Sequence, residues 1–97
     1  MATFVMLVNW TEQGIRDYRD TAKRADAFTD RLKKYGASLK EIYWTLGAYD
    51  IVAVVDAPDD ESMTAAALDV GSLGNIRTTT LRGFTRSELE GIIKKIG

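Results

Sequence analysis

The 97-residue chain contains no cysteine and no histidine. Without cysteine it can form no disulfide, no thiolate nucleophile and no iron–sulfur or zinc–thiolate site. Without histidine it lacks the commonest general base and the usual transition-metal ligand. Its 13 basic and 14 acidic side chains give a net charge of -1, so no basic excess exists to neutralise nucleic-acid phosphates. We therefore expect no metal, no cofactor and no nucleic-acid partner.

Long apolar runs are also missing from the sequence. No segment reaches the roughly 18 apolar residues that a membrane-spanning helix needs. The apolar start, residues 1–10, has neither the charged front nor the cleavage site of a secretory signal. We therefore expect a cytoplasmic protein that does not bind membranes. A chain of this length has room for one domain, residues 1–97, with a modest core that self-association would extend.

The apolar and polar pattern predicts four strands and three helices. The first strand is apolar throughout, which is typical of a strand buried on both faces. Thr11 and Asp59 are expected to cap helices, Gly36 to end one, and Thr85 to form a capping box with Glu88. The predicted elements are a strand at 3–9, a helix at 12–35, strands at 38–46 and 49–56, a helix between 59 and 71, a strand at 76–84 and a helix at 86–96.

The second and third strands are predicted to form a hairpin around Gly47 and Ala48. A two-residue turn with positive φ at its first position favours glycine there. This turn fixes the register, so that Thr45 faces Asp50. One face of the hairpin is then apolar and is expected to lie under the helices: Ile42, Trp44, Leu46, Tyr49, Ile51 and Ala53. The other face is mixed: Glu41, Tyr43, Thr45, Asp50, Val52 and Val54.

The element order β-α-β-β-α-β with right-handed crossovers predicts an α+β, ferredoxin-like antiparallel sheet with both main helices on one face. The first and third strands are then central. The other sheet face, which carries Val52 and Val54, is left bare. Because an exposed apolar face of this size is an association site, we expect a homodimer packed sheet to sheet. The alternative is that the terminal helix folds back over the bare face.

Two stretches resemble the GYD domain family of small bacterial proteins: GAYDIVAVVDAPDDE at 47–61 and LGNIRTTTLRGF at 73–84. Ala48 stands between the glycine and the tyrosine, so the tripeptide that names the family is not contiguous here. The resemblance extends from about residue 4 to about residue 84. It implies a dimeric α+β barrel. Relatives of that barrel group include cofactor-free oxygenases, isomerases and small-ligand regulatory domains, so the resemblance implies no single activity.

The mixed hairpin face offers a candidate site for a small organic ligand, in or beside the barrel. Asp50 could act as a general base and Tyr43 as a donor to a developing oxyanion. Arg77 could bind an anionic group in bidentate fashion. The predicted ligand-binding residues are Asn9, Tyr43, Thr45, Asp50 and Arg77.

Asp50 and Arg77 also have structural interpretations. Asp50 could hydrogen-bond the hairpin backbone. Arg77 and Arg82 could form ion pairs across the dimer. Trp44 is expected in the core, whereas Trp10, at the end of a strand, could line a pocket mouth or pack at a subunit boundary.

Three functions follow from these patterns. The first is a small homo-oligomeric protein that binds a small organic ligand without turnover. The second is a cofactor-free enzyme, of isomerase or monooxygenase type, that acts on a small organic acid or phenol through Asp50, Tyr43 and Arg77. The third is a structural or partner-binding dimer. The sequence favours the first.

Overall fold

The computed structural model describes residues 1–97 as one four-stranded sheet with helices. The elements are β1 (Ala2–Trp10), α1 (Glu12–Arg16), the short 3-10 helix η1 (Tyr18–Asp20), α2 (Thr21–Lys34), β2 (Ser38–Trp44), β3 (Ile51–Ala57), α3 (Asp60–Ser72), β4 (Ile76–Gly83) and α4 (Arg86–Lys94).

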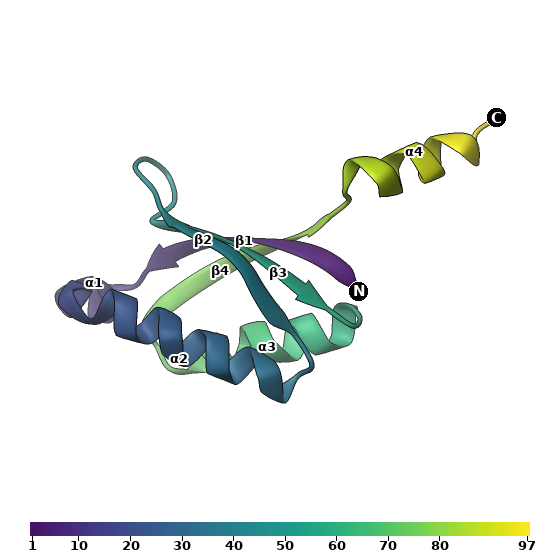
Figure 1. Ribbon diagram of the computed structural model, residues 1–97. Coiled ribbons are helices and arrows are strands. Elements are labelled where there is room, and N and C mark those ends of the chain that lie inside the picture. The colour runs from purple at the N-terminus through teal and green to yellow at the C-terminus, as the bar shows by residue number, and fades with distance from the viewer.

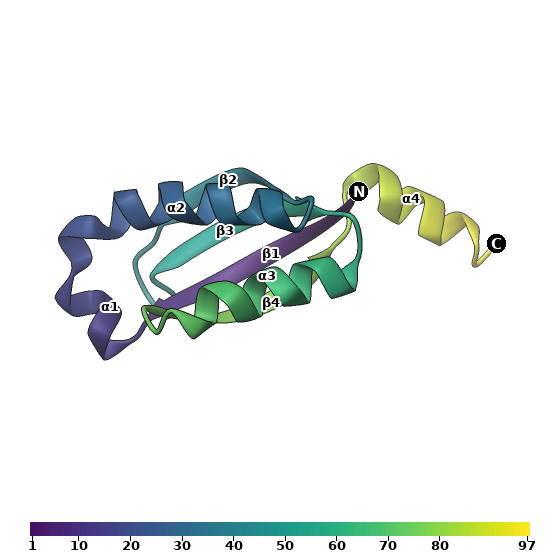
Figure 2. The same cartoon turned by 90° about the horizontal axis from the view of Figure 1, so that it is seen from below.

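The sheet is antiparallel and its strand order is β2-β3-β1-β4. The prediction that the first and third strands are central is therefore confirmed. Helices α2 and α3 lie below the sheet, and its upper face carries no helix (Figure 1). Seen from below, α2 runs along the β2 side and α3 along the β4 side (Figure 2). This is the predicted ferredoxin-like α+β fold.

The core lies between the sheet and the two helices. Residues of β3 alternate between buried and half-buried positions, as expected for a central strand with only one covered face. The largest of the completely buried side chains are Met6, Leu32, Val55 and Met63. Only 13 of the 97 residues are buried, so this core is small for the length of the chain.

The hairpin has the predicted register, because Tyr43 pairs with Val52 and Trp44 with Ile51. Gly47 has a positive φ of +114°, which favours glycine. The predicted two-residue turn is wrong, because the last hairpin bond is Thr45 N to Asp50 O and the loop comprises residues 46–49. Strand β2 ends at Trp44, two residues earlier than predicted, and β3 begins at Ile51, two residues later than predicted.

Two core predictions on this hairpin were wrong. Leu46 is fully exposed and Trp44 is 44% exposed. The hairpin loop projects away from the helix layer, so no helix reaches Leu46 (Figure 1). Trp44 lies on the edge strand β2, and its indole Nε1 donates to Thr21 Oγ1 on the helix side at 2.9 Å.

The prediction of one continuous helix from residue 12 to residue 35 was also wrong. Thr11 caps α1 as expected, but its hydroxyl also donates to Gly74 O at 2.6 Å and its backbone N donates to Asn75 O. These bonds hold α1 against the start of β4, so closely that a Cβ on Gly14 would lie 1.9 Å from Asn75 O. The chain must then turn at Asp17 before α2 can cover the sheet.

The predicted caps of the two later helices are confirmed. Asp59 accepts a hydrogen bond from Ser62 N, and Thr85 and Glu88 form the capping box of α4. Helix α4 extends away from the body of the protein (Figure 1). The alternative in which it folds back over its own sheet is therefore wrong. No helix of the structure combines the length and the apolar character needed to cross a bilayer.

Candidate functional site

The centre of the bare sheet face is apolar. Val5 pairs with Val54 on one side and with Leu81 on the other, and Leu7 pairs with Val52. Paired residues share a face, so these five side chains form one patch, called the valine patch below. Leu81 is 46% exposed, and Glu41 of β2, which pairs with Val54, borders the patch.

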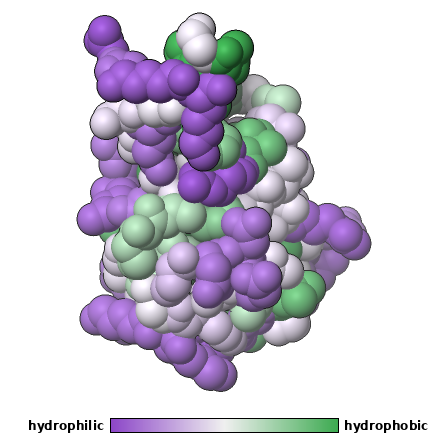
Figure 3. All heavy atoms as spheres, turned by 90° about the vertical axis from the view of Figure 1, so that its right-hand side faces the viewer, coloured by the Kyte–Doolittle hydropathy of each residue, from purple (hydrophilic) through white to green (hydrophobic).

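Helix α4 carries a second uncovered apolar surface. Its stripe consists of Leu89, Ile92 and Ile93 and continues just beyond the helix in Ile96; all four are exposed, the last to 82%. Seen from the α4 end, green hydrophobic side chains reach the surface between purple hydrophilic ones (Figure 3). The valine patch and this stripe are two apolar surfaces that the fold leaves without a covering layer.

Two of the five predicted site residues lie side by side. Asn9 on β1 pairs with Arg77 on β4, and both line an open groove of about 810 Å³ beside the end of α3. Arg77 is exposed and forms no ion pair within the chain. This groove therefore offers a free guanidinium to an anionic partner.

Asp50 and Thr45 lie together at the base of the hairpin loop. Thr45 N donates to Asp50 O at 2.8 Å, and the Thr45 hydroxyl donates to Tyr49 O. The Asp50 carboxylate does not bond the hairpin itself. Its Oδ2 accepts from the backbone N of Trp10 at 2.9 Å, while its own backbone N donates to Val8 O. Asp50 thus joins the end of β1 to the start of β3.

Tyr43 lies on β2, at the opposite sheet edge from Arg77 on β4. Its hydroxyl donates to Glu41 Oε2 at 3.0 Å, and this hydrogen bond raises the pKa of Tyr43 above its usual value. A raised pKa keeps the phenol protonated, as a donor must be. Within one chain, however, Tyr43 and Arg77 are separated by the two central strands.

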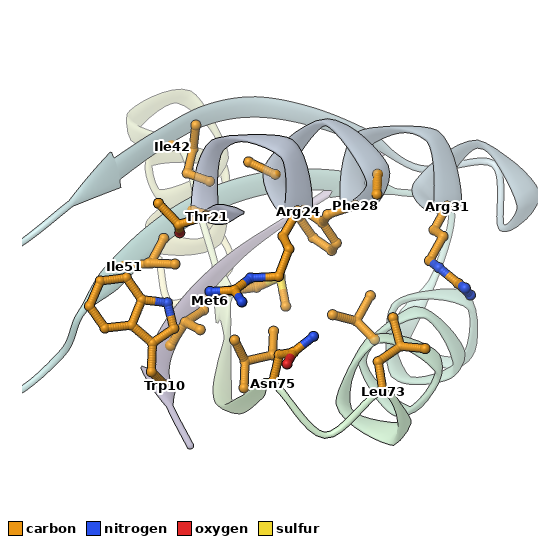
Figure 4. A pocket seen from close by; sticks show the side chains of 16 residues that line it. Met6, Trp10, Thr21, Arg24, Phe28, Arg31, Ile42, Ile51, Leu73 and Asn75 are labelled. Carbon is orange, nitrogen blue, oxygen red and sulfur yellow. The ribbon is translucent and has the colours of Figure 1, made fainter. Parts of the chain in front are cut away.

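The sequence did not predict a partly open cavity on the helix side of the sheet. A cavity of about 110 Å³ lies between α2, the end of α3 and strands β1 and β3. Its walls are largely apolar, with Trp10 and Arg24 at one end (Figure 4). The signal for it in the sequence is weak: small alanines at 25, 27 and 53 leave room where larger side chains would fill the core.

A cluster of three polar side chains joins α2 to α3 beside this cavity. Arg31 Nη1 and the Tyr35 hydroxyl each donate to Asp69 at 2.7 Å. The tyrosine hydrogen bond is the main cause that holds the pKa of Asp69 below its usual range, and it raises the pKa of Tyr35. The sequence did not predict this cluster, because its three residues come from two helices far apart in the chain.

Known proteins resemble this chain over almost its whole length. A protein of Thermus thermophilus named "Glutamine synthetase and cystathionine beta-lyase binding protein" is 30% identical over 95 residues, which are 97% of this chain and 100% of that protein. A crystal structure from the same organism is similar with a TM-score of 0.57 and 25% identity, over 88% of this chain and 95% of that one.

A crystal structure of a hypothetical protein from Pyrococcus horikoshii shares the fold, with a TM-score of 0.56 and 17% identity over 89% of this chain and 93% of that one. The GYD domain family matches residues 4–93, which span both stretches on which the resemblance was drawn and most of α4. The chain belongs to the GYD domain family.

Proposed function

We propose that this protein is a homodimeric binding module that associates with a metabolic enzyme and catalyses no reaction itself. The observation that carries the proposal is the pair of uncovered apolar surfaces, the valine patch and the α4 stripe. Folding alone leaves both in water, which is unfavourable for surfaces of this kind. A cytoplasmic location belongs to the same proposal, consistent with a chain that has no cysteine to oxidise.

A second copy of the chain is the occupant that best fits the valine patch. The patch lies on the two central strands and β4, so two such sheets can stack face to face around a two-fold axis. Helix α4 has only nine residues, and a helix this short is marginal in water unless its apolar side is packed. Docking of α4 on the partner copy would supply that packing and would enlarge a core that is small in the single chain.

Association with an enzyme is supported by the Thermus relative, whose name says that it binds glutamine synthetase and cystathionine β-lyase. The chains align from end to end, so the surfaces of the relative have counterparts here. The alternative of a cofactor-free enzyme has less support, because Tyr43 and Arg77 lie at opposite sheet edges and Asp50 already bonds the β1 backbone.

Isothermal titration calorimetry tests the proposal. The purified protein is titrated with glutamine synthetase and, separately, with cystathionine β-lyase, both taken from the organism that makes this protein. An unrelated enzyme of similar net charge serves as the control. The proposal predicts saturable binding to at least one of the two enzymes and none to the control. Absence of binding to both enzymes, with the protein folded, would contradict the partner assignment.

A small organic anion in the groove beside Asn9 and Arg77 is the second candidate function. It is favoured by the free guanidinium of Arg77 next to an amide side chain. This second function keeps the ligand-binding hypothesis drawn from the sequence for Asn9 and Arg77, two of the five residues predicted to bind a ligand.

A further inference from the structure

The cavity between α2, α3 and the sheet lies on the opposite side of the sheet from the valine patch, and it contains an unusual donor. The indole Nε1 of Trp10 is buried and has no hydrogen-bond partner in the chain. An unpartnered buried donor costs about 1–3 kcal/mol, so most buried N–H groups are paired. By contrast, the indole of Trp44 has its partner in Thr21.

A second donor lies near the first. Arg24 extends from α2 across the cavity toward Trp10 and Asn75 (Figure 4). Its Nη2 donates to Gly14 O at 3.0 Å, and it forms no ion pair. An indole and a guanidinium can only donate, so neither group can satisfy the other.

The charged side chains that line the cavity are all positive. No aspartate or glutamate is among the residues that line the cavity, while Arg24 and Arg31 are. Arg31 is neutralised by Asp69 at 2.7 Å, so its charge is matched at the far end of the cavity. Arg24 is therefore the cation without a counterion, in surroundings where the remaining walls are largely apolar.

We infer that this cavity is a binding site for a small carboxylate with a short apolar tail. The carboxylate would accept hydrogen bonds from Trp10 Nε1 and the Arg24 guanidinium, and the tail would lie against Met6, Phe28 and Ile51. The size limits the tail: the cavity of about 110 Å³ is smaller than the 150 Å³ cavity known to hold the six carbons of benzene, so a branched tail of three or four carbons is the upper limit.

The test is an NMR titration that follows the two indole N–H signals, with 3-methylbutanoate as the probe. The uncharged 3-methylbutan-1-ol has the same carbon skeleton and serves as the matched ligand. The site predicts a saturable shift of the Trp10 indole proton with the carboxylate and an unchanged Trp44 signal. The alcohol is expected to bind at least about ten-fold more weakly, because charge-assisted hydrogen bonds are the stronger ones.

Three variants test whether Arg24 binds the carboxylate. Arg24→Met keeps the alkyl stem and should weaken carboxylate binding about ten-fold or more, whereas Lys23→Met, at an exposed position of the same helix outside the cavity, should leave it unchanged. Arg24→Lys should retain part of the affinity and shows that loss in the methionine variant is not a folding defect. Equal binding of acid and alcohol, an unchanged affinity in Arg24→Met, or no shift of the Trp10 signal at millimolar probe would each overturn the inference. None of these outcomes bears on the dimer or on the enzyme partner.

Discussion

Asp50 shows how one side chain can organise a strand end. Its carboxylate accepts the backbone N–H of Trp10, while its backbone N–H and C=O bond Val8 and Thr45. A single residue thereby connects β1, β2 and β3 at the point where the ladder between β1 and β3 ends. The same contact fixes the backbone of Trp10, whose indole lines the cavity.

Replacement of Asp50 by alanine removes the acceptor and leaves the partly buried Trp10 N–H unpaired. We expect the free energy of unfolding to fall by about 1–2 kcal/mol, the range for a hydrogen bond to a charged group after partial exposure. Asp50→Asn keeps a side-chain oxygen and should lose less than half of that amount. Urea denaturation of the three proteins measures both values. Equal stability of wild type and Asp50→Ala would refute this role.

Residue-level predictions succeeded where the interaction is local in sequence. Thr11, Asp59 and Thr85 each cap a helix by bonding a backbone N–H three residues ahead, so a short sequence window contains both partners. Asp50 and Trp10 are 40 positions apart, and nothing in either neighbourhood indicates the bond between them. The convergence of Arg24 and Trp10 on one cavity is non-local in the same way.

At the level of elements, the break between α1 and α2 is the main departure from the sequence pattern. The apolar spacing of residues 15–35 fits one continuous helix, which is why periodicity alone predicts it. The break is imposed by contacts with residues 74 and 75, where Thr11 and Gly14 meet the start of β4. Tertiary packing overrides helical periodicity here, and the turn through η1 directs α2 over the sheet.

The cluster of Arg31, Tyr35 and Asp69 makes the attachment of α2 to α3 depend on pH. The folded-state pKa of Asp69 is lowered, so its contribution is complete above the unfolded value of 3.8 and is lost as the pH falls through the lower folded value. The folded-state pKa of Tyr35 is raised, so its contribution is present below 10.0 and is lost as the pH rises through the higher folded value.

We therefore expect wild type to be more stable than Asp69→Asn at neutral pH, and the difference to shrink at both acidic and strongly alkaline pH. Urea midpoints of the two proteins across the pH range measure it, with Asp30→Asn as a control at an exposed acid on α2. A difference that stays constant from acid to neutral pH would contradict the account.

For the whole molecule, the shape is elongated and leaves apolar surfaces uncovered. The chain extends over 52 × 30 × 17 Å because α4 projects from one end, and one sheet face has no cover. The sequence predicted this bare face correctly, since strand alternation and the hairpin turn are short-range rules. It did not predict the direction of α4, because no pattern within residues 84–97 specifies what the apolar side of that helix meets.

Native mass spectrometry of wild type beside two variants of Val52 tests the dimer most directly. Val52 lies on the valine patch opposite Leu7, so Val52→Glu should place a charge in the proposed interface, and Val52→Thr is a matched neutral control. We predict that wild type and Val52→Thr have twice the chain mass of 10.8 kDa and that Val52→Glu has the single mass with a native circular dichroism spectrum. A wild-type monomer, or a Val52→Glu protein that is still dimeric, would contradict the sheet-to-sheet dimer.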